Sequence, residues 1–193
     1  MMKTHIQSVP LEKSYRLLNH GPTVLVSAEH DGIVDVMAAA WGCALEFSPA
    51  KVTIVLDKMT KTRELVEQSG HFILQIPNFK QLKMTHQLGT TSLHGNADKL
   101  KNAGTEIFYQ ADYPNLPLVE GCSGWILCKV ISNEEQHQQH DLFIGEVLAA
   151  YADDRIFKDG HWHFAEASKE WYSLHYMAGG TFYLIGEEVK VED

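Results

Sequence analysis

Two Asp-Gly pairs, each set within β-rich sequence, constrain the fold of this chain more than any other feature. The first, Asp31-Gly32, follows a run over residues 23–27 and precedes a long run over residues 33–47. The second, Asp159-Gly160, lies within residues 156–164. Asp-Gly between two β-rich runs is the strongest short-range signal for a tight hairpin, because both residues tolerate a positive φ. We therefore expect antiparallel strands at both ends of the chain.

The rest of the pattern extends these hairpins into a sheet. Residues 33–47 are long enough for one bent strand or two strands. Residues 51–57 alternate, so that Val52, Ile54 and Leu56 point to one buried face. Further β-rich runs cover residues 71–77, 124–132, 142–152 and 181–191. Many short strands with few helices are typical of a closed or nearly closed antiparallel barrel.

Three short helices and one loop complete the expected elements. Thr60 is placed to cap a helix over residues 61–68 that ends at Gly70. Asn78 is placed to cap a helix that runs to about Leu88, and residues 97–102 form another. The polar stretch 133–141 lies between two β-rich runs and is predicted to be an exposed hairpin loop.

Size and charge limit the class of protein. The 193 residues are 45% hydrophobic and contain no repeat or linker, which predicts a single domain over residues 1–193 with an N-terminal lead-in over 1–20. The formal net charge of −9 argues against binding to nucleic acids or anionic membranes, which both need a basic surface. Without a long apolar run or a signal peptide, the chain is expected in the cytoplasm.

The histidines and cysteines do not form a recognisable metal motif. Cys43, Cys122 and Cys128 are too few and wrongly spaced for a zinc site or disulfide scaffold, and we expect buried thiols. Among the eleven histidines, His161 and His163 would share one face of a strand, and a further pair, at 137 and 140, lies in the polar loop. No carboxylate or thiol completes either pair. We therefore predict no metal site and favour solvated or packed histidines.

Standard nucleophile and nucleotide motifs are also missing from the sequence, which contains no Gly-x-Ser-x-Gly, Gly-x-Gly-x-x-Gly or Walker pattern. Three other segments remain as candidates. In residues 57–63 a strand leads into a helix beside lysines and threonines, which suits either a bound phosphate or a well-capped, solvated helix start. The polar segment 92–99 is interpreted either as a loop that covers a ligand or as an ordinary exposed loop. The small side chains of residues 37–42 either let a flat ligand approach the backbone or pack closely in the interior of a barrel.

These segments occur together and in order in a known family. The chain resembles the flavin reductase-like, FMN-binding split-barrel family, in particular its flavoredoxin-like branch. The resemblance extends over nearly the whole chain and rests on short motifs that include residues 21–27, Asp31-Gly32, 35–37, Trp41, Ser48-Pro49, 52–56, 60–63, 70–72, 76–77, Asp98-Lys99, Cys128, 143–147, Asp159-Gly160, 174–175 and 178–180. It implies a mainly β fold with added helices: a six-stranded antiparallel Greek-key split β-barrel.

The resemblance also implies a cofactor, FMN, held non-covalently, and usually a homodimer. The isoalloxazine ring would be lined by Met37, Ala38, Ala39, Ala40 and Trp41. The ring edge and ribityl chain would contact Val55, Leu56, Asp57 and Lys58. The phosphate would be held by Thr60, Lys61 and Thr62. A loop that closes over the flavin, from the same or the partner subunit, would contain His94, Gly95, Asn96 and Lys99.

The function implied is an oxidoreductase in which FMN takes a hydride from NAD(P)H and passes electrons on, with His94 as a speculative proton donor or gate. A flavoredoxin-type electron carrier, reduced by a protein partner, is the alternative. A barrel that has lost its flavin is a third reading. The family often has Asn where this chain has Asp35, and Thr or Ser where it has Ala38 and Ala40. Fewer hydroxyls mean fewer hydrogen bonds to flavin, and Asp35 would disfavour a phosphate that it faced.

Overall fold

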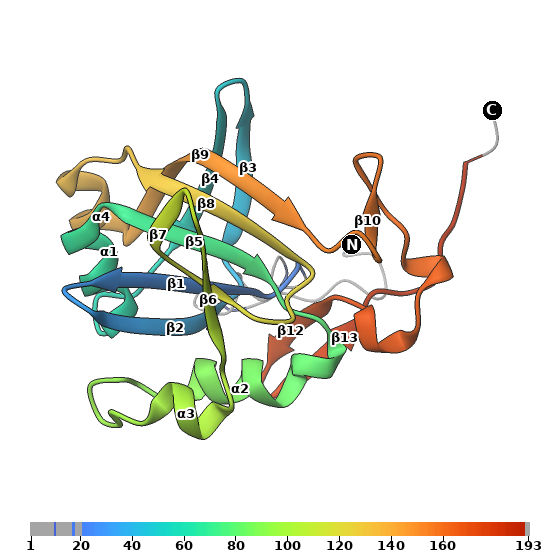
Figure 1. Cartoon of the computed structure of the whole chain (residues 1–193), viewed down its shortest axis with the longest axis horizontal. Coiled ribbons are helices and arrows are strands. Elements are labelled where there is room, and N and C mark those ends of the chain that lie inside the picture. The colour runs from blue at the N-terminus through green and yellow to red at the C-terminus, as the bar shows by residue number, and fades with distance from the viewer. Residues whose placement is uncertain (1–9, 11–16, 18–20, 192–193) are drawn as a thin grey trace, which may run out of the picture.

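A seven-stranded antiparallel sheet forms the centre of the molecule (Figure 1). The computed structural model describes Pro10, Leu17 and residues 21–191, so the expected lead-in over residues 1–20 lies almost entirely outside the described residues. The strand order is β2-β1-β5-β8-β9-β4-β3. These strands are β1 (Val24–His30), β2 (Ile33–Ala39), β3 (Gly42–Phe47), β4 (Ala50–Val55), β5 (His71–Ile76), β8 (Gly124–Val130) and β9 (Leu142–Ala152). The expected mainly β, antiparallel architecture is confirmed, with seven strands in the main sheet rather than six.

Both Asp-Gly hairpins are present. In the first, His30 pairs with Ile33, and Asp31 and Gly32 take φ values of 49° and 75°. In the second, Asp159 and Gly160 join β10 (Phe157–Lys158) to β11 (His161–Trp162) with φ values of 51° and 78°. Positive φ at both turn positions matches the right-handed twist of the flanking strands, which is why this pair favours the two-residue turn.

The sheet curls until its two edges approach each other. The edge strands β2 and β3 are consecutive in the chain and are joined only by Ala40 and Trp41. A flat sheet of seven strands would hold its edges far apart, because neighbouring strands lie about 4.8 Å apart. The two-residue bend therefore requires a barrel-like closure, and it places residues 37–41 at the rim of that barrel.

Apolar side chains are buried on both faces of the curled sheet. One core cluster combines alternate strand residues, such as Val26, Phe72 and Phe143, with Leu65 and Val66 of α1 (Lys61–Ser69). A second cluster lies on the other face and includes Leu25, Ile73 and Leu127, together with Leu88 of α2 (Leu82–Thr90). The period-2 alternation within each strand separates the two clusters.

The helix α1 forms where its caps predict. The Thr60 hydroxyl accepts a hydrogen bond from the Arg63 backbone N–H at 3.4 Å, and Gly70 ends the helix with φ 68°. Its buried face presents Leu65 and Val66 to the core, and it packs against β1 and β2. The first turn of α1 is thereby fixed beside the strand β2 that leads to the barrel rim.

Smaller elements cover the second face and the C-terminal end. They are η2 (Phe79–Gln81), α3 (Lys99–Ala103), β6 (Ile107–Gln110), β7 (Tyr113–Val119), η3 (Phe164–Glu166), η4 (Lys169–Trp171), β12 (Leu174–Ala178) and β13 (Thr181–Leu184). The hairpin β6–β7 was not predicted from the sequence. The predicted strand over 181–191 ends at Leu184. No helix among the described residues is long and apolar enough to span a membrane.

Two expectations about polar and sulfur-containing residues are wrong. The predicted loop 133–141 is the helix α4 (Glu134–His140), which begins because the side chains of Asn133 and Gln136 cap each other's backbone N–H. In this helix His137 is buried and its ring stacks on Phe143 with centroids 4.1 Å apart, which agrees with the packed alternative expected for the histidines. Cys43 is exposed on edge strand β3, whereas the other two thiols are buried as expected.

Candidate functional site

A cavity of about 380 Å³ lies at the barrel rim. One wall is the end of β2 and the bend after it, and the opposite wall is α2. The C-terminal hairpin β12–β13 contributes two aromatic side chains. The lining residues are Thr23, Met37, Ala38, Ala39, Ala40, Trp41, Val55, Asp57, Thr85, His86, Gly89, Thr90, Asp141, Tyr176 and Phe182.

A second cavity, of about 180 Å³, lies beside the first turn of α1. It shares Met37, Gly89 and Thr90 with the first cavity, so the two adjoin along one wall. The remaining lining residues are Asp35, Met59, Thr60, Lys61, Thr62, Leu88, Thr91, Ser92 and Lys99. The site is therefore elongated, with a wide and largely apolar compartment leading to a narrow polar one.

Gly89 is what lets the helix α2 approach the sheet. A Cβ added at Gly89 would lie 3.1 Å from the Cβ of Ala38. Such a distance is shorter than an ordinary contact between methyl groups. Glycine on the helix and alanine on the strand together keep the junction between the two compartments open.

A buried hydroxyl on the wall of the larger compartment has no partner. Thr85 is fully buried, and its Oγ1 atom makes no hydrogen bond within the described part of the chain. Buried hydroxyls are nearly always paired in folded proteins, because an unmade hydrogen bond costs about 1–3 kcal/mol. An unpaired hydroxyl on a cavity wall is a group that a polar ligand atom can satisfy.

The narrow compartment ends at the N-terminus of α1. Thr60 donates from its hydroxyl to the carbonyl of Asp57 at 2.7 Å, and this bond fixes the strand-to-helix turn. The ammonium of Lys61 lies 2.8 Å from Glu64, and the hydrogen bond from Lys61 lowers the pKa of that carboxyl. Free backbone N–H groups and a nearby ammonium are the features by which helix N-termini bind anions.

Asp35 is the third charged group at this end, and it is 1% exposed. Its Oδ1 atom lies 2.8 Å from the Lys99 ammonium, and its Oδ2 atom accepts a hydrogen bond from the Thr62 hydroxyl at 2.7 Å. Lys99 and Thr62 are equally buried, at 2% and 0% exposure. These three side chains therefore form a closed polar cluster on the wall of the narrow compartment.

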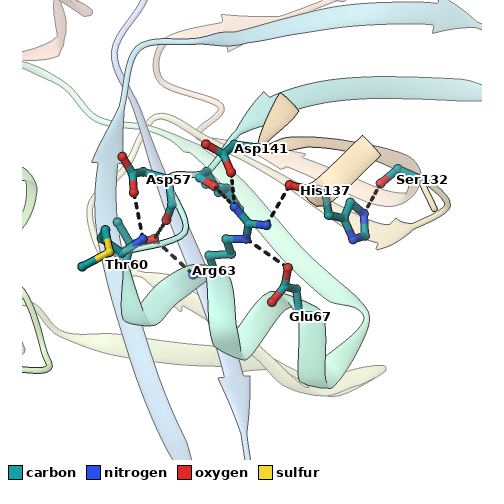
Figure 2. A network of polar contacts seen from close by, with 9 residues as sticks. Asp57, Thr60, Arg63, Glu67, Ser132, His137 and Asp141 are labelled. Atoms are coloured by element: carbon teal, nitrogen blue, oxygen red, sulfur yellow. Dashed lines mark hydrogen bonds and ion pairs between the residues drawn. The ribbon is translucent and has the colours of Figure 1, made fainter. Parts of the chain in front are cut away.

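Arg63 follows in the sequence but does not face either cavity. Figure 2 shows its guanidinium turned away from the helix start, towards Glu67, Asp141 and the carbonyl oxygen of His137. Burial alone would lower the pKa of Arg63, but its hydrogen bonds to Glu67 and Asp141 raise it. A further hydrogen bond of 3.1 Å to the Leu56 carbonyl ties α1 to the strand. Arg63 therefore holds α1, β4 and the end of α4 together.

Most of the residues predicted for the flavin line one of the two compartments. Met37 to Trp41, with Val55 and Asp57, line the wide compartment, and Thr60, Lys61, Thr62 and Lys99 line the narrow one. Leu56 is instead buried in the barrel core, and Lys58 is exposed and lines neither compartment.

The predicted loop residues His94, Gly95 and Asn96 also lie outside both linings. His94 Nε2 lies 3.1 Å from a carboxylate oxygen of Glu64 on α1. Gly95 and Asn96 are engaged in turns of the loop itself. A contact between this loop and a flavin stays a prediction.

Sequence reasoning missed the contribution of α2 and the C-terminal hairpin. Thr85, His86, Gly89 and Thr90 line the wide compartment because they recur at helical spacing on one face of α2. That spacing is visible in the sequence, but only the tertiary structure brings this face against β2. Tyr176 and Phe182 reach the compartment from a hairpin almost 140 residues away from β2, for which no local signal exists.

The described residues hold no group of three or more His, Cys, Asp or Glu side chains placed to share a metal ion. His137 bonds through Nε2 to the Ser132 hydroxyl at 2.6 Å, and His163 lies 3.9 Å from Glu166.

Comparison with known proteins gives a consistent result. The model of a flavin reductase like domain matches residues 16–176. The uncharacterized protein YddH of Escherichia coli is 37% identical over 184 residues, covering 94% of this chain and 95% of its own length. The structure of an FMN-binding domain of a flavin reductases-like enzyme from Shewanella baltica is 55% identical, covers 96% of this chain and 97% of its own, and superposes with a TM-score of 0.87.

A further solved structure bears on the fold alone. A protein from Shewanella frigidimarina with a split barrel domain is 16% identical, covers 99% of this chain and 97% of its own, and has a TM-score of 0.76. The expected split-barrel fold is therefore confirmed.

Proposed function

Because the chain belongs to the flavin reductase-like domain family, we propose that it binds FMN non-covalently in the two joined compartments and acts as an oxidoreductase. The finer proposal is a NAD(P)H-dependent flavin reductase. The Shewanella baltica relative, at 55% identity, supports the choice of cofactor, since it is an FMN-binding domain.

The shape and polarity of the site carry this proposal. FMN has a flat aromatic ring at one end and a phosphate at the other, joined by a hydroxylated chain. The wide compartment, lined by Met37 and the alanines of β2, suits the ring, and the helix start at Thr60 and Lys61 suits the phosphate. The Thr85 hydroxyl, which has no hydrogen-bond partner among the described residues, is available to a polar atom of the flavin.

The protein contributes binding and orientation to this proposed activity. The bound flavin would supply the hydride and electron chemistry. Met37 and Ala38 would exclude water from one face of the ring, and the N–H groups at the start of α1 would orient the phosphate. Trp41, which is 51% exposed at the rim, would lie where a second substrate such as a nicotinamide approaches.

The first experiment is the visible absorption spectrum of the purified protein, before and after incubation with FMN and removal of the excess by gel filtration. The two-banded yellow absorbance of oxidised flavin is expected to remain after the wash. A colourless protein that also fails to quench FMN fluorescence at micromolar concentration would contradict the proposal.

Turnover separates the finer proposal from the alternative. We expect the FMN-loaded protein to oxidise NADH or NADPH with added flavin and oxygen over many cycles. A protein that holds FMN but oxidises neither nucleotide faster than free flavin would instead be an electron carrier that needs a protein donor. The net charge of −9 would then favour a basic partner surface.

We also propose that the protein is a homodimer. The hairpin of β3 and β4 projects from the barrel (Figure 1) and exposes Phe47 completely and Leu45 by 52%. Exposed apolar side chains on a projecting edge hairpin are typical of a protein interface. Light scattering after gel filtration should give twice the chain mass of 21.8 kDa, and Phe47→Ser should shift it towards the monomer. A monomeric mass at high micromolar concentration would rule the dimer out.

A further inference from the structure

The narrow compartment, where the proposed function puts an anion, contains a carboxylate, that of Asp35. Asp35 lines it together with Lys61, Thr62 and Lys99, at the end where the proposed function puts the phosphate. A carboxylate beside a phosphate is repulsive, and the repulsion is larger in a buried site than in water. The arrangement of Asp35 therefore bears on which flavins the site prefers.

Asp35 uses both of its oxygen atoms within the protein. One oxygen pairs with the Lys99 ammonium at 2.8 Å and the other accepts the Thr62 hydroxyl at 2.7 Å. The side chains of Asp35 and Lys99 are only 1% and 3% exposed, so neither charge is screened by water. The opposite charges of Asp35 and Lys99 therefore nearly cancel at the position of a ligand in the compartment.

This pairing engages one predicted phosphate ligand, Thr62, and a buried ammonium, that of Lys99, which lines the same compartment. Lys99 is satisfied by Asp35 and needs no anion from a ligand, and Thr62 directs its hydroxyl proton to the same carboxylate. Lys61 is the remaining ammonium, and it shares its charge with Glu64 at 2.8 Å. What is left for a phosphate is mainly the backbone N–H groups at the start of α1.

We propose that Asp35 is a specificity-determining residue: by neutralising Lys99, it weakens the preference of the site for FMN over the unphosphorylated flavin, riboflavin. The proposal rests on the proposed function, because it assumes that flavin occupies the joined compartments. Asp35 acts on the phosphate end only, so it leaves the binding of the isoalloxazine ring unchanged.

The substitution Asp35→Asn tests this directly. Asparagine keeps an oxygen that accepts the Thr62 hydroxyl but removes the charge that pairs with Lys99. A phosphate then becomes the anion that Lys99 lacks, so the ratio of riboflavin Kd to FMN Kd should rise about tenfold. Both constants are measured by flavin fluorescence quenching. A ratio that stays within threefold of the wild-type ratio, or falls, would overturn the proposal.

Two further variants keep the test decisive if Asp35→Asn folds poorly. Lys99→Gln leaves Asp35 charged and should lower the same ratio by more than threefold. The double variant Asp35→Asn, Lys99→Gln is neutral at both positions and should return the ratio to within threefold of wild type. The opposite directions of the two single changes, with recovery in the double variant, are the signature of a charge effect. Any other pattern among the variants that fold contradicts the proposal.

Asp31→Asn is the matched control, because it makes the same change of charge in the exposed turn between β1 and β2. It should leave both constants unchanged. Flavin binding by the wild-type protein distinguishes failure of the proposed function from failure of the role proposed for Asp35. If neither flavin binds the wild-type protein, the proposed function fails; if both bind and the ratio does not respond to Asp35→Asn, only the role of Asp35 fails.

Discussion

Gly89 of α2 lies directly against Ala38 of β2, so closely that a Cβ placed on the glycine would come within 3.1 Å of the alanine Cβ. Both residues line the wide compartment, and Gly89 also lines the narrow one. The alanine at position 38 therefore has a packing role, since a larger residue there would meet the helix.

Gly89→Val is predicted to block flavin binding without unfolding the protein. The added methyl groups overlap Ala38 and enter the junction of the two compartments, at a cost in stability of about 1–3 kcal/mol. The Kd values of FMN and riboflavin should both rise at least tenfold in fluorescence titrations. Gly186→Val is the control, because a Cβ at that position meets nothing within 4 Å. Unchanged Kd values for the Gly89 variant would show that the flavin does not occupy this junction.

His86, rather than His94, is predicted to affect flavin binding. His86 lines the wide compartment, and its ring meets Phe182 edge-on with centroids 6.3 Å apart. Loss of one ring contact is worth about 1 kcal/mol, or a factor of about five in Kd, so His86→Ala should weaken FMN binding by that factor.

His94→Ala should change FMN binding and NAD(P)H oxidation by less than about twofold, because its contact to Glu64 is exposed to solvent and lies outside both compartments. Fluorescence titration and steady-state turnover of the two variants provide the measurement. A large loss of turnover in His94→Ala with normal binding would restore the role of His94 as a proton donor.

Arg63→Met is predicted to destabilise the fold. Arg63 is 2% exposed and bonds to Glu67, Asp141 and two backbone carbonyls. Removing the guanidinium takes its hydrogen bonds from those acceptors and leaves two partly buried carboxylates without their counter-charge, which should lower the free energy of unfolding by about 3 kcal/mol. Urea denaturation followed by tryptophan fluorescence measures the change. Arg155→Met, at an exposed ion pair, serves as the control and should have a much smaller effect.

His137 is predicted to make the protein less stable as the pH falls. Burial lowers the pKa of His137 in the folded state, and the charge of Arg63 contributes in the same direction. The unfolded chain therefore binds a proton first, and stability declines as the pH falls below about 6.5 until the folded-state pKa is passed.

The measurement compares Tm for wild type and His137→Gln between about pH 8 and pH 5. The advantage of the wild type should shrink at the lower pH, because glutamine does not titrate. A wild-type advantage that is constant or grows on acidification would contradict the assignment.

Local sequence determined the elements whose stabilising interactions lie within a few residues of each other. The turn Asp31-Gly32 needs only two residues that tolerate positive φ, and α1 begins and ends at caps three and four residues from their partners. The alternation of Val52, Ile54 and Leu56 likewise fixes which face of β4 is buried. Such features were predicted correctly because their free energy depends on neighbours in the chain.

Tertiary structure decided the features that depend on distant partners. The helix α4 begins at a local capping box between Asn133 and Gln136, but the burial of its His137 against the Phe143 ring depends on packing against the sheet. Lys99 and Thr62 contact Asp35 from segments 64 and 27 residues away, so one expected phosphate ligand, Thr62, and one residue of the expected flavin loop, Lys99, bind a carboxylate instead.

The shape of the site has the same origin. Its residues on α2 and the C-terminal hairpin meet β2 only through tertiary packing, with Gly89 of α2 directly against Ala38. Sequence by itself thus determined the family, the strands of the main sheet and the start of α1. The charge balance and the walls of the compartments were decided by packing, because electrostatic and van der Waals contacts depend on distance in space and not on separation along the chain.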